Sequence, residues 1–198
     1  SHIARLSSIV EFGQKMGRKI VFMGRSMAKY VRAAEATGIA NFTNKVEVLK
    51  FSGQIKKKLK KIAKDRGKYL MVATGHQGEP NSVLSKMMSG ELKFKFFPED
   101  HIIFSCRTIP TPTNIENRQR LEASLKSFNV RLFKDIHQSG HAAREDLRDL
   151  INLARPKHII PAHGEPIMLN ALADLAAEMG YKKGENVHIM GNGERIKL

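Results

Sequence analysis

Residues 69–80, which read YLMVATGHQGEP, decide the fold. An apolar run over residues 69–73 leads into a turn that contains Gly75 and Gly78 and ends at Pro80, a residue suited to the first turn of a helix. Because the run is apolar almost without interruption, it predicts a strand of a parallel sheet that is covered on both faces. The stretch is therefore typical of a strand, loop and helix unit in an α/β protein.

Units of this kind recur along the chain. Short apolar or β-branched runs alternate with helical patterns, which predicts a doubly wound, Rossmann-like α/β layer. Strands are expected over residues 19–23, 46–51, 69–74, 101–106, 129–133 and 158–161. Helices are expected over residues 3–16, 26–37, 54–65, 81–88, 115–128, 142–154 and 166–179. Gly67 and Gly180 are expected just after helix ends, and Asn114 is expected to cap the helix that opens at Ile115.

The net charge indicates the class of partner. The 198 residues include 34 Lys and Arg against 19 Asp and Glu, a formal charge of +15. Cations near phosphates release condensed counterions, so this charge favours nucleic acid as the partner. A Lys-rich surface of a thermophile or of a generally basic proteome would give the same total, so the positions of the charges must decide.

Other bulk features bound the compartment. The one cysteine, Cys106, excludes an internal disulfide, and a reducing cytoplasm is the expected location. No apolar run is long enough to span a membrane, and the sequence has no pattern of a secretory signal peptide, so no membrane partner is expected. The chain opens at Ser1, without Met, directly in a helical pattern, which suggests a piece of a longer protein.

The loops that follow the strands carry the candidate binding residues, because ligands of open α/β sheets bind beyond the carboxyl ends of strands. Arg25 and Arg107 suit a phosphate clamp or a solvated surface equally well. Gly75 and Gly78 could let the backbone approach an anion, or they could simply form a turn with positive φ. The loops in question are 24–27, 74–80, 105–110 and 137–142.

Histidines mark a second group of candidates. His137 and His141 are spaced i, i+4, but Ser139 and Gly140 between them favour a loop over a helix, with His141 near a helix N-terminus. His163 ends an apolar run and could be a metal ligand, although a lone histidine is more often structural. The cationic stretch 52–66 has the pattern of an amphipathic helix whose lysines form a solvated face.

Several of these motifs together resemble the ribonuclease J family of metallo-β-lactamase/β-CASP nucleases, and the archaeal branch in particular, because His76 replaces a serine usual in bacterial members. The motifs are FMGRSM at 22–27, TGHQGEP at 74–80, HQSGHA at 137–142 and PAHGE at 161–165. The resemblance implies a β-CASP domain over 1–133 and the C-terminal α/β part of a metallo-β-lactamase domain over 134–198. It also implies single-stranded RNA as the partner, with a 5′-monophosphate.

The resemblance assigns roles to individual residues. His141 would act at the scissile phosphate, and His163 would be a zinc ligand in an enzyme that uses two zinc ions. The residues implied in phosphate or RNA binding are Arg25, Ser26, Gly75, His76, Gln77, Gly78, Arg107, His137, Ser139, Gly140 and His141. The family's main metal motif, His-x-His-x-Asp-His, is absent from the sequence. We therefore expect the full-length protein to be a 5′-to-3′ exoribonuclease with internal cleavage as a second activity, and this chain alone to be inactive.

The sequence leaves other functions open. The strongest is a non-catalytic module that binds RNA or single-stranded DNA through the same cationic loops. A DNA-directed member of the same superfamily is a further alternative. A nucleotide-binding Rossmann domain would need a Gly-x-Gly-x-x-Gly motif directly after a strand, and the sequence has none. Exposed apolar surface in the region from about Lys134 predicts self-association, and a homodimer is expected.

Overall fold

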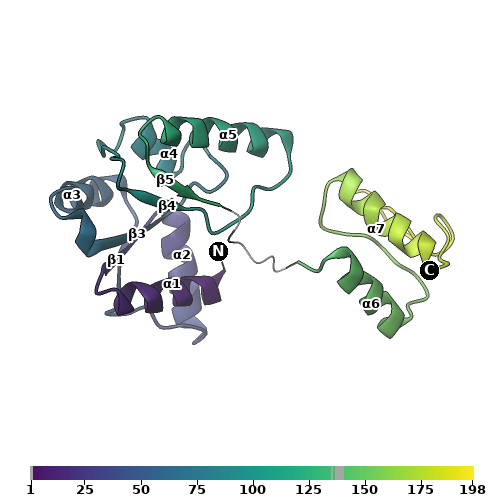
Figure 1. Cartoon of the computed structure of the whole chain (residues 1–198). Coiled ribbons are helices and arrows are strands. Elements are labelled where there is room, and N and C mark those ends of the chain that lie inside the picture. Colours follow the sequence, from purple (N-terminus) through teal and green to yellow (C-terminus); the bar gives the residue numbers. More distant parts are fainter. Residues whose placement is uncertain (1, 135, 137–140) are drawn as a thin grey trace. The chain divides into compact units, whose positions relative to one another are not determined.

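The computed structural model describes residues 2–134, 136 and 141–198. The chain folds as two compact units, Ser1–His137 and Gln138–Leu198 (Figure 1). The predicted division between 1–133 and 134–198 concerns the domains of the family and stays a prediction. None of the described helices is long and apolar enough to cross a membrane.

The N-terminal unit is built on a parallel sheet with the order β2-β1-β3. The central strand β1 (Lys19–Met23) pairs with β2 (Val46–Leu49) on one side and with β3 (Tyr69–Ala73) on the other. A second parallel sheet pairs β4 (His101–Ile103) with β5 (Arg131–Phe133). The helices are α1 (Ile3–Lys15), α2 (Arg25–Ala36), α3 (Ser52–Ile62), the 3-10 turn η1 (Arg66–Lys68), α4 (Val83–Met88) and α5 (Pro112–Lys126).

Strand β1 is buried on both faces, as its apolar run predicts. Ile20 and Phe22 pack into a cluster with side chains of α1 and α2. Val21 and Met23 point to the opposite face, into a cluster with side chains of α3, α4 and α5. Since consecutive residues of a strand alternate between faces, helices must cover both sides of the sheet. The predicted doubly wound α/β architecture is confirmed.

The described residues of the C-terminal unit, 141–198, form the helices α6 (Arg144–Ala154) and α7 (Pro166–Glu178). Its core is formed by Ile151, Ile159, Ala173, Ala176 and Val187. The strand expected over 158–161 is present only as a bridge between Ile159 and Val187. Among the described residues, no neighbouring segment runs beside it long enough to form a ladder, so the apolar run does not become a regular strand.

Two of the expected helix ends were wrong. Helix α5 begins at Pro112, and its cap is Thr111, whose hydroxyl accepts a bond from the Asn114 amide at 3.4 Å. Asn114 is therefore inside the first turn, because Pro112 at the first helical position starts the helix earlier than the apolar pattern indicates. Gly67 lies within η1, whereas α3 ends at Ile62. Gly180 does follow α7 with a φ of 93°.

Candidate nucleic-acid interface and histidine pair

The carboxyl edge of the β2-β1-β3 sheet contains a topological switch point. From β1 the chain first goes to β2 on one side and later to β3 on the other, so the loops after β1 and β3 diverge. In open α/β sheets this divergence creates the crevice in which ligands bind. The loops concerned begin at Gly24 and Thr74, which are two of the loops that the sequence indicated.

A groove of about 490 Å³ lies at this edge. Its walls come from the ends of all three strands: Arg25 and Ser26 follow β1, Lys50 follows β2, and Thr74 follows β3. Among the lining residues, Arg25, Lys29 and Lys50 are cationic and Glu79 is acidic, so cations outnumber carboxylates. The full lining comprises Arg25, Ser26, Lys29, Lys50, Thr74, Glu79, Asn81 and Ser82. The balance of charge suits an anionic ligand.

Several groups of the groove are free to bind an anion: two cationic side chains and the first amides of α2. Arg25 and Lys29 are exposed and form no ion pair among the described residues. Helix α2 begins at this edge, directly after its N-cap residue Gly24, and no described side chain accepts a hydrogen bond from its first amides. The positive end of the helix and the two cations therefore act on the same groove. Ser26 lies in that first turn.

Backbone contacts hold β1, β2 and β3 together at the groove. The Gly24 amide donates to the Leu49 carbonyl at 3.0 Å. A side chain at Gly24 would come within 2.8 Å of Thr74, so glycine permits this close approach. The Thr74 hydroxyl accepts a bond from the Val83 amide at 3.2 Å and so supports the start of α4. The floor of the groove is thus fixed by the sheet and by α4.

The glycines of the 74–80 loop serve the fold of the protein itself. Gly75 has a φ of 127°, and a side chain there would meet Ser82 at 2.7 Å. Gly78 has a φ of 75°, and a side chain there would overlap the Asn117 carbonyl of α5. The positive φ that the sequence suggested for these glycines is therefore observed. A direct role for them in phosphate binding stays a prediction.

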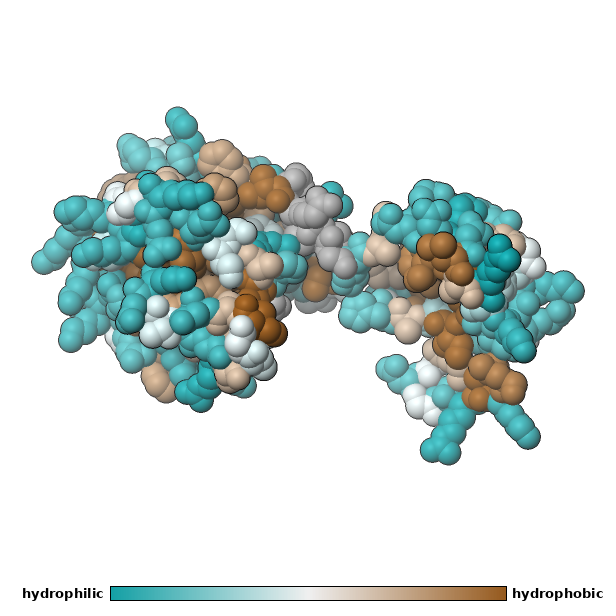
Figure 2. Space-filling view, turned by 90° about the horizontal axis from the view of Figure 1, so that it is seen from below, coloured by the Kyte–Doolittle hydropathy of each residue, from teal (hydrophilic) through white to brown (hydrophobic). Residues whose placement is uncertain are grey.

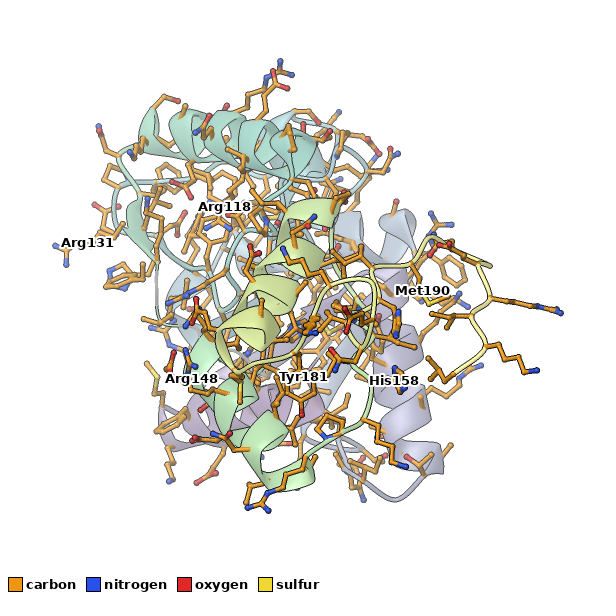
Figure 3. All side chains as sticks on the ribbon, turned by 90° about the vertical axis from the view of Figure 1, so that its right-hand side faces the viewer. Arg118, Arg131, Arg148, His158, Tyr181 and Met190 are labelled. Carbon is orange, nitrogen blue, oxygen red and sulfur yellow. The ribbon has the colours of Figure 1, made fainter. Side chains whose placement is uncertain are left out.

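Arg118 fastens this loop to α5. The side chain, labelled in Figure 3, is only 5% exposed. Its guanidinium lies 3.4 Å from the centroid of the Phe104 ring. It donates to the His76 carbonyl at 2.6 Å and pairs with Glu122 at 2.8 Å. A buried cation needs such partners, so the contacts make the position of the loop a property of the core.

Gln77 joins the 74–80 loop to the 105–110 loop. Its side chain is buried, donates to the Arg107 carbonyl at 3.1 Å and accepts from the Ile109 amide at 2.9 Å. The amide group of Gln77 is thus engaged within the protein, while the Arg107 side chain is exposed. The predicted contacts of both residues with RNA stay predictions, and the two bonds of Gln77 hold the backbone of the 105–110 loop at Arg107 and Ile109.

His76 is half-buried in the same loop. Burial lowers the pKa of its imidazole, and the nearby Glu79 carboxylate opposes that effect. The neutral form of the ring is therefore favoured at neutral pH. A neutral imidazole can donate or accept a hydrogen bond but does not add to the positive charge of the groove.

The C-terminal unit brings two predicted residues together. The rings of His141 and His163 have centroids 5.2 Å apart and an interplanar angle of 58°. His163 has a φ of 63°, a left-handed conformation that is uncommon outside glycine and often found at functional sites. His141 precedes Ala143, whose amide donates to Asp146 at 2.8 Å and thereby caps α6. His137, Ser139 and Gly140 lie outside the described residues.

The pair meets part of the requirement for zinc. Imidazole nitrogen is a common zinc ligand, but a catalytic zinc ion uses three protein ligands. In the part of the chain that the structure describes, no group of three or more His, Cys, Asp or Glu side chains could hold a metal ion. His141 and His163 can therefore supply donors to a metal site but do not complete one. A second pair, His158 and His188, is joined by a 3.0 Å contact between ring nitrogens.

Sequence reasoning missed part of the groove, including Lys29, Lys50 and Asn81. Lys29 lies one helical turn after Arg25, so the helical periodicity could have revealed that both face the same ligand. Lys50 was assigned to a strand that in fact ends at Leu49. The loop positions of Lys50 and Asn81 depend on where strand and helix end, which sequence patterns indicate only approximately.

Comparisons with known proteins agree with these features. Residues 1–120 match the family model described as "Ribonuclease J, beta-CASP domain", and residues 128–190 match "Zn-dependent metallo-hydrolase RNA specificity domain". The whole chain is 43% identical to ribonuclease J of Pyrococcus abyssi over 198 residues and to that of Methanocaldococcus jannaschii over 199 residues. It is 29% identical to ribonuclease J of Sinorhizobium meliloti over 203 residues. The chain spans 44% of the length of the first two relatives and 34% of the third.

Proposed function

The chain belongs to the ribonuclease J family, and from this premise we propose that its N-terminal unit binds single-stranded RNA along the carboxyl edge of the β2-β1-β3 sheet. The observation that carries the proposal is the groove in which Arg25, Lys29 and Lys50 converge from two strand ends. Phosphates of the RNA backbone would lie against these cations and the uncapped start of α2. Arg107 would extend the contact from the neighbouring loop.

In the full-length protein, we assign the C-terminal unit to the catalytic step. His163 would donate a ring nitrogen to zinc, with His141 beside it. Bound zinc would supply Lewis-acid activation of a water and of the phosphodiester. His141 would give a proton or a hydrogen bond to the scissile phosphate, with Ser139 and Gly140 holding the phosphate group. The activity is 5′-to-3′ exonucleolytic on 5′-monophosphorylated RNA in the cytoplasm, with two zinc ions in the complete site and internal cleavage as a second activity.

A second function applies to the 198-residue chain by itself. The described residues contain no cluster of three or more His, Cys, Asp or Glu side chains that could hold a metal ion. By itself, the chain would therefore act as a non-catalytic RNA-binding module. The assay is binding and cleavage of a 5′-monophosphorylated single-stranded RNA with added zinc. We expect binding without cleavage. A version that spans the full length of its relatives should cleave, and His141→Ala in that version should not. Metal-dependent cleavage by the 198-residue chain would overturn this assignment.

The groove is tested with two variants of equal charge. The double variant Arg25→Ala, Lys29→Ala removes two cations from the groove. The control Lys57→Ala, Lys64→Ala removes two exposed cations from α3 and its C-terminal end. Each phosphate contact on a single strand contributes about 0.7 to the slope of log affinity against log salt concentration. The groove variant should therefore lower the slope by about 1.4, and the control should change it much less. Equal losses would contradict the proposal and indicate diffuse attraction by the net charge.

A further inference from the structure

Phe51 is an exposed aromatic ring beside the groove. It follows β2 by two residues and immediately precedes α3, so it lies at the carboxyl edge of the parallel sheet. It is 57% exposed. The ammonium group of Lys50 lies over the ring, 5.1 Å from its centroid, and Lys50 lines the groove. The ring and the cationic groove are therefore neighbours.

The backbone of this segment is held in place by Gln54. Its side-chain oxygen accepts bonds from the amides of Lys50 at 3.3 Å and Phe51 at 3.2 Å. These two amides come directly after the last residue of β2. A segment whose backbone is already held loses less freedom when a ligand packs on it, so this anchoring favours binding.

We propose that Phe51 is a stacking platform for one base of the RNA whose phosphates occupy the groove. The inference rests on the proposed RNA-binding function and adds a base-binding subsite to it. One face of the ring would take the base, while Lys50 stays close enough to contact the phosphate of the same or the next nucleotide. Stacking on an aromatic ring does not depend on which base is present, so the subsite suits an enzyme that moves along RNA of any sequence.

Phe12 provides a matched comparison within the same unit. It is 63% exposed, and Lys15 lies over its ring at 5.5 Å from the centroid. However, Phe12 lies in the last turn of α1, which leads into the start of β1 and hence to the amino edge of the sheet. Exposure and a neighbouring lysine are thus common to both residues, and only Phe51 adjoins the groove.

The test uses fluorescence, because the chain contains no tryptophan. Phe51→Trp and Phe12→Trp each introduce one reporter ring of the stacking type. The ligands are a short single-stranded RNA and an oligomer of the same length whose nucleotides all lack bases. RNA should quench Trp at position 51 and should leave Trp at position 12 unchanged. The oligomer without bases should bind through its phosphates without quenching either reporter.

Affinity measurements complete the test. Phe51→Ala should weaken RNA binding by about tenfold, in keeping with the loss of one base stack. It should leave the affinity for the oligomer without bases unchanged, as Phe12→Ala should for both ligands. If RNA binds but neither quenching nor the loss at position 51 occurs, the stacking subsite is overturned while the groove remains. If the unsubstituted chain binds neither ligand, the proposed function itself fails.

Discussion

His141 and His163 lie side by side, with ring centroids 5.2 Å apart, although the whole of α6 separates them in the sequence. Both were predicted as site residues from separate motifs. Their proximity is a property of the C-terminal unit alone, in which α6 and α7 pack together. Each histidine comes shortly before one of these helices. The packing of the two helices is thus what brings the two imidazoles to one place.

The histidine pair predicts a shared response to zinc. In the 198-residue chain, Zn²⁺ bound to a nitrogen of His163 should shift the ring signals of His163 directly and those of His141 as well, because the two ring centroids are 5.2 Å apart. His163→Ala should abolish the zinc-induced shift of His141, whereas His141→Ala should leave that of His163 in place. Histidine-selective NMR during a zinc titration measures this, with His101 of the N-terminal unit as an internal reference. A His141 signal that still responds to zinc in His163→Ala would refute His163 as the zinc ligand.

Gly78 should tolerate no side chain. In Gly78→Ala, the new carbon would overlap the Asn117 carbonyl, and the residue would keep a φ of 75°. Backbone strain and the overlap together should lower the free energy of unfolding by about 2 kcal/mol or more. Gly38→Ala is the control, because Gly38 has a similar φ of 70° with open space around it. That variant should lose only about 1 kcal/mol. Urea unfolding compares the two, and equal losses would show that α5 can move aside.

Gln77 should act on RNA binding through Arg107. Gln77→Leu removes the bonds to the Arg107 carbonyl and the Ile109 amide and should lower the free energy of unfolding by about 1 to 3 kcal/mol. If Arg107 contacts RNA, the same variant should weaken binding, and in an Arg107→Ala background it should weaken binding no further. Binding assays on this double-mutant cycle decide the matter. Additive losses would contradict a positioning role. Gln14→Ala, at an exposed position of α1, is the control for stability.

How much the sequence could predict depended on whether a feature is local. The strand at 19–23 was predicted with its observed bounds, since a continuous apolar run between polar residues has little alternative in a parallel sheet. Arg25 and Ser26 were placed at the groove because they follow that strand directly. The role of Gly78 was not predictable, because the Asn117 carbonyl that it contacts belongs to a distant segment. Phe51 was assigned to a strand, whereas a bond from its amide to Gln54 takes it out of the ladder.

His76 should make stability depend on pH. Burial lowers the pKa of His76 in the folded protein below its ordinary value of about 6.5. The unfolded chain therefore binds a proton at this position more readily than the folded chain does. As pH falls below about 6.5, the unfolded chain is protonated at this position before the folded chain is. The unfolded state is thereby stabilised, and the free energy of unfolding should decrease. In His76→Gln that part of the decrease should vanish. Urea unfolding at pH 7.5 and 5.5 gives the difference, and parallel profiles for both proteins would contradict the prediction.

Apolar side chains on the C-terminal unit should drive self-association, which is the basis for the homodimer we propose. Leu153 of α6 is 84% exposed and Ile167 of α7 is 79% exposed, and apolar patches lie on the visible surface of this unit (Figure 2). Burying such side chains between two copies would be favourable, at about 25 cal/mol per Å² of apolar area. The double variant Leu153→Lys, Ile167→Lys should therefore be monomeric at concentrations at which the unsubstituted chain dimerises. Phe12→Lys, at an exposed apolar position of the N-terminal unit, should leave association unchanged. Sedimentation velocity over a wide concentration range measures the effect, and a strictly monomeric unsubstituted chain would exclude the dimer.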